Sequence, residues 1–452
     1  MIRVLAICHE DVEWILGGMG RHVHELYRFM GYRGDVKIDL LNSGSGEGSG
    51  VFRSFHRHMS DKLVPWKPRG ESMGAQMVSD IQLIKTLLRL VNEGHRWDVI
   101  HVHEWPALQV AWAARDALGV PLVATMHLCI STLGQFDGGP QVDIDTKNAT
   151  LLNKIRSTSN LSKEEEATLR CKWNMASIPG RELSGYIQNQ EARLIVESDE
   201  TILCSKAYAK MAKDYFLMGV IDKPLNMIHN GIDTSVWHPL AGRADRAKAK
   251  HHLPWDRDIA FFCGRIAHMK GVEPLLDALE SKDTGYCVVM AGAVNAITDD
   301  DAEAWSVTQR IRSLQKEHPE RLRWLDYQKG QDLIDLYAAA DIGLMPSVHE
   351  PFGIVALEFM AMGVPLISTE VDGLGEIVVS GPSEAQEHAV IIPPNSPRDI
   401  LVGMDMLRGK ENRDVLRDRG IARVEDFTWE EAAAKTVDVY RKAIGARNAG
   451  NS

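Results

Sequence analysis

Two carboxylates, Glu350 and Glu358, stand eight positions apart around a predicted turn between a strand and a helix. Residues 340–347 read as a short buried strand, and residues 355–362 have helical spacing of apolar residues. Gly353 is therefore predicted near a helix N-terminus, where unpaired N–H groups and the helix dipole favour a diphosphate. In that geometry one carboxylate can face a sugar ring and the other the ribose hydroxyls. Glutamates on a helix face are often only solvated, and that interpretation stays open.

Basic residues suited to phosphate follow the strand predicted at Ile259 to Cys263. Arg265 offers a planar fork and Lys270 a point charge, so the two could hold one diphosphate and offset charge on a leaving group. The Gly-Gly-Met-Gly turn at residues 17–20 also permits close backbone approach to a phosphate. This turn lacks both the Gly-x-Gly-x-x-Gly fingerprint and the P-loop sequence. The alternatives are solvated basic side chains and a plain tight turn.

Histidines close two neighbouring predicted strands. His101 and His103 lie at i and i+2 and share a sheet face, and His127 ends the next strand. The three could be metal ligands, so a metal-dependent hydrolase is an alternative function. Later strands offer no obvious further ligand, so we expect hydrogen-bonded structure for two of them and a reacting sugar beside His127. Asp143 and Asp145 could hold a divalent ion, but they do not follow a strand and are expected to be solvated.

The elements that position these residues form two similar sets. Apolar runs alternate with helical patterns in the first half, which is typical of a doubly wound α/β domain with a parallel sheet. The rhythm restarts near residue 259, and Trp237 to Arg243 has the Pro and Gly of a hinge. We predict two domains, residues 1–238 and 239–426, with a cleft between them. The predicted strands are Ile2–Cys8, Val36–Leu41, Val99–Val102, Pro121–Met126, Glu200–Cys204, Leu225–Ile228, Ile259–Cys263, Tyr286–Ala291, Leu322–Leu325, Asp341–Met345, Pro365–Ser368 and Ala389–Ile392.

Two segments break this pattern. Gly44 to Gly50 is a low-complexity loop of Gly, Ser and Glu. Asp143 to Arg193 is polar and helix-rich without a strand signal, and we predict an inserted helical region beside the cleft where an acceptor could be recognised. The last amphipathic stretch, Thr428 to Ala443, could pack on either domain.

Composition restricts the partners and the compartment. The 452 residues include 51 Lys and Arg against 62 Asp and Glu, and the net charge of −11 argues against nucleic acid or an anionic membrane as partner. The six cysteines are widely spaced, as expected for reduced intracellular core residues. The N-terminal apolar run is too short for a signal peptide, and no apolar stretch approaches the ~18 residues of a membrane span. We expect a cytoplasmic protein without a transmembrane segment; its oligomeric state is not determined by the sequence.

In this order, the motifs together resemble family 4 of the retaining nucleotide-sugar glycosyltransferases, which has glycogen synthase-like, sucrose-phosphate synthase-like and phosphatidylinositol mannosyltransferase-like members. The resemblance covers nearly the whole chain and is weakest from Asp143 to Arg193. The matching pieces are Gly17-Gly18-Met19-Gly20, Asp98–Trp105, Thr125–His127, Ile228–Asp233, Gly264-Arg265 with Lys270-Gly271, Glu350–Gly353 with Glu358, and Gly363–Pro365.

The resemblance implies a GT-B fold, with two Rossmann-like doubly wound domains and an interdomain cleft. The first domain would hold mainly the acceptor, the second mainly the donor nucleotide, and a C-terminal helix at 427–445 would cross back onto the first domain. The implied reaction moves a hexosyl group, with glucosyl expected, from a nucleoside-diphosphate sugar to a carbohydrate or other hydroxyl acceptor, with retention and without a metal or other cofactor.

The same resemblance assigns roles to single residues. Arg265 and Lys270 match the diphosphate clamp, Glu350 lies at the donor sugar, Glu358 contacts the ribose, and His127 lies near the 6-hydroxyl of the sugar. The implied catalytic residues are thus His127, Arg265, Lys270 and Glu350. The implied donor-binding residues are Gly17, Gly18, Gly264, Arg265, Lys270, Glu350, Phe352, Gly353, Ile354, Val355 and Glu358.

One departure from the family pattern bears on substrate. Bacterial glycogen synthases of this family carry Lys-x-Gly-Gly-Leu near the start, whereas Ile15 and Met19 replace the lysine and the leucine here. ADP-glucose and glycogen are therefore in doubt, and smaller acceptors become competitive. The sequence does not choose among UDP, GDP and ADP as the donor nucleotide. An epimerase or hydrolase of nucleotide sugars with the same architecture is a further alternative.

Overall fold

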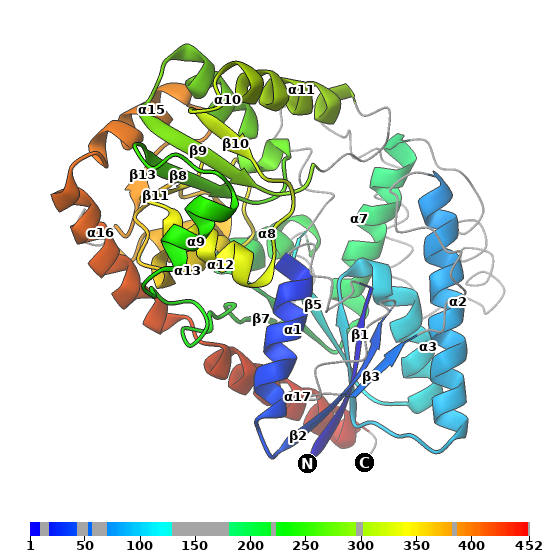
Figure 1. Cartoon of the computed structure of the whole chain (residues 1–452). Helices are drawn as coiled ribbons and strands as arrows, with labels where there is room; N and C mark the ends of the chain where they lie inside the picture. The colour runs from blue at the N-terminus through cyan, green and yellow to red at the C-terminus, as the bar shows by residue number, and fades with distance from the viewer. Residues whose placement is uncertain are drawn as a thin grey trace.

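The computed structural model describes residues 1–9, 18–42, 53–56, 70–128, 180–217, 223–294, 302–381 and 387–450. These residues form two α/β units, each a parallel sheet with helices on its faces (Figure 1). The doubly wound architecture predicted from the alternating apolar runs is confirmed. The predicted loop at 44–50 and the insertion from Asp143 up to residue 179 lie outside the described residues.

The first unit contains a seven-stranded sheet with the strand order β3-β2-β1-β4-β5-β6-β7. Every pairing in it is parallel. Its strands are β1 (Ile2–Cys8), β2 (Val36–Asn42), β3 (Arg53–His56), β4 (Val99–His103), β5 (Leu122–Met126), β6 (Glu200–Leu203) and β7 (Leu225–Met227). Its helices are α1 (Gly18–Gly31), α2 (Gly70–Asn92), α3 (Leu108–Leu118), α7 (Gly180–Glu197) and α8 (Lys206–Tyr215).

The second unit contains a six-stranded parallel sheet with the order β10-β9-β8-β11-β12-β13. Its strands are β8 (Asp258–Cys263), β9 (Tyr286–Ala291), β10 (Leu322–Trp324), β11 (Ile342–Met345), β12 (Leu366–Ser368) and β13 (Val390–Ile391). Its helices are α9 (Arg243–Lys250), α10 (Val272–Ser281), α11 (Ala302–Glu317), α12 (Gly330–Ala339), α13 (Ile354–Ala361), α14 (Gly375–Val378), α15 (Pro397–Met406) and α16 (Lys410–Arg423).

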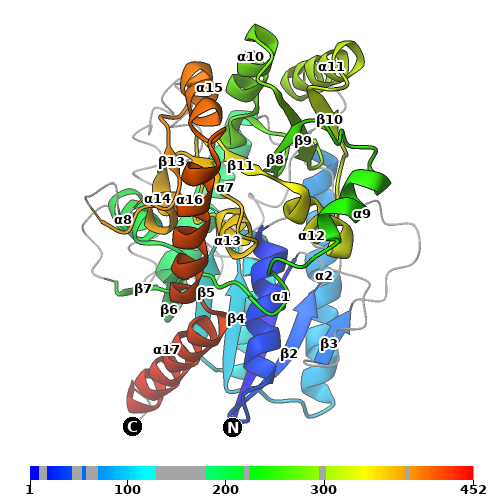
Figure 2. The same ribbon diagram turned by 60° about the vertical axis from the view of Figure 1, so that its left-hand side comes forward.

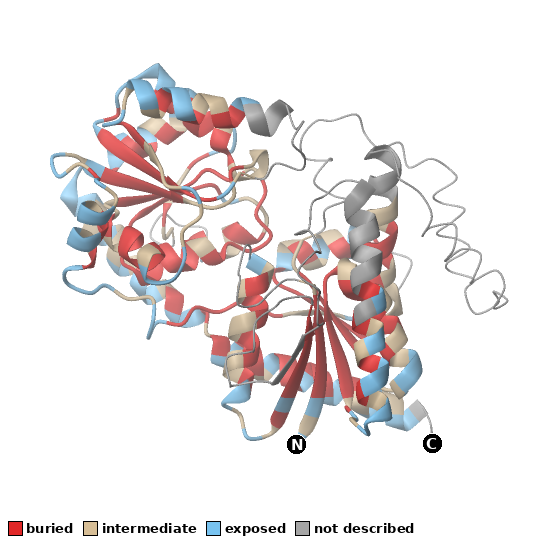
Figure 3. Ribbon diagram, turned by 45° about the vertical axis from the view of Figure 1, so that its right-hand side comes forward, coloured by how far each residue is buried: buried red, intermediate tan, exposed pale blue. Residues whose placement is uncertain are grey.

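The central strands are buried on both faces, which is why their sequences are apolar without alternation. β4, β5 and β9 have no exposed residue (Figure 3). Each sheet has one apolar cluster on either face, and the helices cover these clusters with their apolar stripes. The cluster under α13 also includes Cys204 and Ile232 of the first unit, so the two units share part of a core.

The last helix, α17 (Trp429–Gly450), returns to the first unit (Figure 2), where it contacts α1. Trp429 and Tyr440 are buried there in one cluster with Val23 and Tyr27. Gly231 permits this crossing, since a Cβ at Gly231 would lie 2.2 Å from the backbone nitrogen of Trp429. The predicted domain limits at 238 and 426 stay predictions, but the final helix does lie against the first sheet's helices.

Candidate functional site

The site-bearing loops lie at the two topological switch points. In the second sheet β8 separates β9 from β11, and in the first sheet β1 separates β2 from β4. At such a point consecutive connections leave to opposite sides, and the carboxyl ends of the strands border a crevice where ligands bind. The loop with Lys270 follows β8 and the loop with Glu350 follows β11, whereas His103 ends β4.

Lys270 and Glu350 come together as an ion pair. Nζ of Lys270 lies 2.6 Å from Oε2 of Glu350, and the side chains are 17% and 11% exposed. The structure thus joins two residues that the sequence placed in one site, 80 positions apart. In this state each of them neutralises the other.

The two loops are also fixed by their backbones. The amides of Val348 and His349 both donate to the carbonyl oxygen of Met269, at 3.0 and 3.1 Å. Gly271 has a φ of +69°, and a Cβ there would lie 1.9 Å from the carbonyl oxygen of Pro346. Only glycine fits this approach, so the loop that carries Lys270 has one position relative to the strand end of β11.

Arg265 stands in the same loop as Lys270 but has a different environment. It is partly exposed, and its Nη2 lies 3.7 Å from the sulfur of Met269. Within the described ranges no carboxylate pairs with this guanidinium. Its charge is therefore available to an anionic ligand, in line with its predicted part in a diphosphate clamp. The adjacent Gly264 packs closely on the second sheet, since a Cβ at Gly292 would lie 1.7 Å from its carbonyl oxygen.

Gly353 and the start of α13 form the predicted turn. Gly353 adopts a left-handed φ of 104°, and α13 begins at the next residue, Ile354. The free N–H groups and the dipole of this helix end favour an anion, as the sequence predicts. Val355 is partly exposed, but the side chain of Phe352 is only 3% exposed and lies against Phe427 in the core. The ring of Phe352 is therefore buried in this state, and the predicted place of Phe352 among the donor-binding residues stays a prediction.

Glu358 is fully buried and has two partners. The hydroxyl of Tyr337 donates to Oε2, and the guanidinium of Arg21 forms an ion pair with Oε1. Arg21 belongs to α1 of the first unit, so this contact crosses the junction. The guanidinium of Arg21 also lies over the ring of Trp237, with Cζ 5.5 Å from the ring centroid. Arg21 was missed by the sequence analysis; its place one turn into the helix after the glycines was the available signal.

Of the glycines in the first loop, Gly17 lies outside the described residues, as does the Asp143 and Asp145 pair. Gly18 is the first residue of α1, so residues 18–20 are helical and do not belong to the predicted turn. A Cβ at Gly18 would meet no atom within 4 Å, which leaves the start of this helix open on that side.

The histidines form a buried hydrogen-bond network. Nδ1 of His103 lies 3.1 Å from Nε2 of His127, and Nε2 of His103 lies 2.6 Å from the hydroxyl of Tyr27. His101 bonds through Nδ1 to the hydroxyls of Tyr27 and Tyr440, at 2.9 and 2.6 Å, and through Nε2 to Thr125 Oγ1 at 2.7 Å. Hydrogen-bonded roles for His101 and His103 agree with the prediction.

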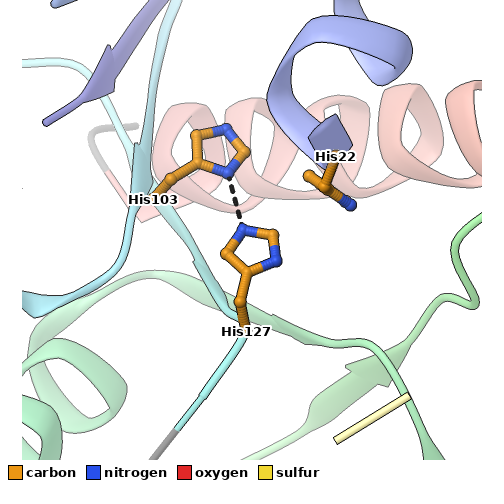
Figure 4. A group of neighbouring side chains, drawn as sticks. All are labelled: His22, His103 and His127. Atoms are coloured by element: carbon orange, nitrogen blue, oxygen red, sulfur yellow. Dashed lines mark hydrogen bonds between the residues drawn. The ribbon is translucent and has the colours of Figure 1, made fainter. Parts of the chain in front are cut away.

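The cluster differs in one member from the three histidines that the alternative metal-dependent hydrolase would use. Both ring nitrogens of His101 are engaged by hydroxyls, whereas His22 of α1 takes its place beside His103 and His127 (Figure 4). One nitrogen from each of these three rings lies within 4.8 Å of the others. Nδ1 of His22 lies 2.6 Å from Oδ1 of Asn230.

These imidazoles are neutral at physiological pH. Burial lowers the pKa of His22 to about 4, against a smaller opposing effect of its bond to Asn230. Burial also lowers the pKa of His103 and His127 well below the usual value, and the neighbouring histidines lower it further. The cluster therefore offers lone pairs and neutral N–H donors rather than positive charge.

Among the described helices, none combines the length and the apolar character needed to span a bilayer.

Two family models match this chain in succession. Residues 16–236 match the model described as Glycosyltransferase Family 4, and residues 244–422 match the model described as Glycosyl transferases group 1. A glycogen synthase of Mycobacterium tuberculosis is 26% identical, over 98% of this chain and 95% of its own. A D-inositol 3-phosphate glycosyltransferase of Corynebacterium diphtheriae is 28% identical, over 77% of this chain and 71% of its own.

Solved structures share the fold. Sucrose-phosphate synthase from Thermosynechococcus elongatus superposes with a TM-score of 0.72 at 19% identity, over 99% of this chain and 100% of its own. The catalytic domain of starch synthase IV from Arabidopsis thaliana, bound to ADP and acarbose, gives a TM-score of 0.72 at 16% identity, over 98% and 99%. Anabaena HepE, in complex with UDP and glucose, gives 0.64 at 16% identity, over 98% and 100%.

Proposed function

This chain belongs to the family 4-like glycosyltransferases of GT-B fold, which act on nucleotide sugars, and we propose that it transfers a hexosyl group to a hydroxyl acceptor with retention of configuration. The observation that carries this proposal is the Lys270–Glu350 pair at the switch point of the second sheet. It places a cation for the leaving diphosphate directly beside a carboxylate for the sugar.

The second domain, residues 239–426, holds the donor in this proposal. Arg265 and Lys270 bind the diphosphate together with the N–H groups at the start of α13, which Gly353 exposes. Glu358 accepts from the ribose hydroxyls after Arg21 has left its Oε1. Arg265, Lys270 and the N–H groups stabilise the negative charge of the diphosphate most strongly once its bond to the sugar has broken. They therefore lower the activation barrier and do not only strengthen donor binding.

The transfer step breaks the bond between the anomeric carbon and the diphosphate oxygen. The acceptor hydroxyl, held by the first domain, residues 1–238, attacks the oxocarbenium-like sugar from the face that the diphosphate leaves. Its proton passes to the departing phosphate oxygen, so the configuration is retained without a protein nucleophile. Glu350 positions the sugar, and His127 hydrogen-bonds its 6-hydroxyl as a neutral imidazole. Closure of the domains limits hydrolysis because it excludes water.

Glucose is the sugar that we propose. Structural neighbours were solved with UDP and glucose and with ADP, and relatives include a glycogen synthase, which supports a glucosyl donor. Ile15 and Met19, in place of the lysine and leucine of bacterial glycogen synthases, support an acceptor smaller than glycogen. The proposed reaction needs no metal or other cofactor, because Arg265, Lys270 and the helix end supply the positive charge. We also infer a cytoplasmic location, which is supported by thiols, rather than disulfides, at Cys204, Cys263 and Cys287.

The first experiment is a screen of UDP-, GDP- and ADP-sugars for thermal stabilisation. A ligand bound only by the folded state raises the melting temperature, so the donor can be found before the acceptor is known. Acceptors are then tested with that donor in the presence of a chelator, and the anomer formed is read by proton NMR coupling. Transfer with a retained anomer supports the proposal. An inverted anomer contradicts it, and turnover of the donor without any acceptor product would instead support an epimerase or hydrolase.

A further inference from the structure

Three imidazoles converge at the first switch point from three separate elements. His22 comes from α1, His103 from the end of β4 and His127 from the loop after β5 (Figure 4). We propose that His22, His103 and His127 form a binding site for a transition-metal cation of the Zn²⁺ class, and that the bound cation blocks transfer. The binding does not depend on the proposed function; the block does, because it rests on the role given to His127.

The spacing of the nitrogens fits such an ion. Tetrahedral Zn²⁺ with Zn–N bonds of about 2.0–2.1 Å holds its nitrogens about 3.3–3.4 Å apart. Nδ1 of His103 and Nε2 of His127 lie 3.1 Å apart, and the nitrogen of His22 lies within 4.8 Å of both. An approach of up to about 1.5 Å by the ring of His22 would therefore complete three ligand positions of a tetrahedron.

An unsatisfied nitrogen marks the same place. Nε2 of His22 is buried and has no hydrogen-bond partner among the residues that the structure describes. Its other nitrogen, Nδ1, bonds to the amide oxygen of Asn230 at 2.6 Å and so carries the proton. The lone pair of His22 consequently sits on Nε2, within a cluster of other imidazoles: the ring centroids of His22 and His127 are 4.4 Å apart. A buried lone pair without a donor is costly, and a cation would satisfy it.

The ring nitrogens that would not face the ion have hydrogen-bond partners of the kind found at metal-bound histidines. A ligating imidazole usually donates its second N–H to an oxygen, which fixes the tautomer. Asn230 Oδ1 does this for His22, and the hydroxyl of Tyr27 can accept from Nε2 of His103 and free Nδ1 for the ion. A carboxylate also lies near, since Oε1 of Glu104 accepts from the backbone amides of His127 and Leu128.

The donor set predicts which ions bind. Three neutral imidazoles favour Zn²⁺, Cu²⁺, Ni²⁺ or Co²⁺ over Mg²⁺ and Ca²⁺, which prefer oxygen ligands. One tetrahedral position is left for water. An ion here would fix the ring of His127 through Nε2 and place a positive charge beside the sugar site, so the 6-hydroxyl could no longer bond to a neutral, freely oriented imidazole. The site is therefore inhibitory and not a requirement for transfer.

Co²⁺ titration of the chelator-treated, tag-free protein tests the binding directly, because tetrahedral Co²⁺ absorbs visible light. The expected result is one Co²⁺ per chain, displaced by Zn²⁺ and not by Mg²⁺. His22→Gln and His127→Gln should bind at least 100-fold more weakly. Asn230→Ala, which removes only an outer partner, should lose about 10–100-fold. His251→Gln is the control, since this half-buried histidine follows α9 in the second unit, away from the triad and its partners, and it should bind like the wild type.

Folding of each variant is checked by thermal unfolding without metal; if His22→Gln does not fold, the partly exposed His127→Gln decides. Equal Co²⁺ binding by the wild type and His127→Gln, or no binding by the wild type, would overturn the site. Inhibition is measured as loss of donor turnover on addition of Zn²⁺, absent in His22→Gln. If the metal binds but does not inhibit transfer, the blocking role is overturned and the metal site stands. Thermal stabilisation by UDP-glucose tests the proposed function separately.

Discussion

Lys270 and Glu350 neutralise each other across 2.6 Å, at the point where the loops after β8 and β11 meet. Both side chains are largely buried, so neither charge is well solvated. A donor diphosphate would take over the ammonium of Lys270, and Glu350 would then be left to accept from the sugar hydroxyls. The pair therefore keeps both groups in place while the site is empty, and the ligand exchanges one ionic partner for another.

Lys270→Ala should lower donor turnover by about 100–1000-fold, the range found when one preorganised group for a developing negative charge is removed. The melting temperature should fall much less, because the loop is also held by Gly271 and by two amides bonded to Met269. Lys282→Ala is the control: Lys282 is about half exposed and pairs with Asp405 at the surface. It should change neither property, and wild-type turnover by Lys270→Ala would rule out the clamp.

Glu358→Gln should weaken binding of the donor nucleotide by about 10–100-fold, the equivalent of one hydrogen bond to a charged group, with a smaller change in turnover. Calorimetric titration with the nucleoside diphosphate measures it. Because Glu358 also pairs with Arg21, the variant Arg21→Met separates the two effects. Affinity that survives in Arg21→Met but not in Glu358→Gln assigns the ribose contact to Glu358. Equal losses in both variants would mean that the affinity depends on the ion pair alone.

Much of the fold was predictable because buried parallel strands have continuous apolar sequences. The limits of β1 and β9 were predicted to the residue, at Ile2–Cys8 and Tyr286–Ala291. β3 was missed, since Arg53–His56 is short and largely polar and becomes a strand only through its pairing with β2 at the sheet edge. The start of α1 was also misplaced, because glycines read as a loop although Gly18 and Gly20 lie within the helix.

Only those site residues that follow the carboxyl ends of strands could be placed together from the sequence. The sequence brought Lys270 and Glu350 to one sheet edge, but the partner of Glu358 comes from the other domain, and no local pattern reports such a contact. The histidines show a second limit. His101 and His103 share a face by the i, i+2 rule, which says nothing about depth along the strand. His101 lies two residues farther from the carboxyl end of β4 than His103, and both of its ring nitrogens bond to hydroxyls. The third histidine of the cluster is therefore His22.

Gly271→Ala should unfold the loop that carries Lys270. Its φ of +69° costs an L-residue about 1–2 kcal/mol, and a Cβ 1.9 Å from the carbonyl oxygen of Pro346 adds about 1–3 kcal/mol of overpacking, for a loss of about 2–5 kcal/mol. Gly119→Ala is matched to it, because Gly119 has a φ of +67° and no atom within 4 Å of a Cβ. In Gly119→Ala the free energy of unfolding should fall only by the cost of the positive φ, about 1–2 kcal/mol. Urea unfolding of both variants measures the difference; equal losses would show that Pro346 yields without cost.

Ser205→Ala should weaken the link between the two domains. The hydroxyl of Ser205 caps α8 by accepting from the amide of Tyr208, and it donates to the carbonyl oxygen of Pro351, next to Glu350, at 2.8 Å. Loss of the cap costs about 1 kcal/mol. The buried carbonyl of Pro351 would keep only the weak thiol donor of Cys204, at 3.6 Å, which costs at most about 1–3 kcal/mol more.

Ser396→Ala is the comparison for a cap away from the junction, because Ser396 accepts from the amide of Asp399 at the start of α15 and donates only to the side chain of the same Asp399. Ser205→Ala should therefore lower the free energy of unfolding by more than Ser396→Ala, and it alone should lower donor turnover, since the loop with Glu350 and Gly353 loses a fixed neighbour. If both variants lose about 1 kcal/mol and keep full turnover, the hydrogen bond to Pro351 does not hold the site together.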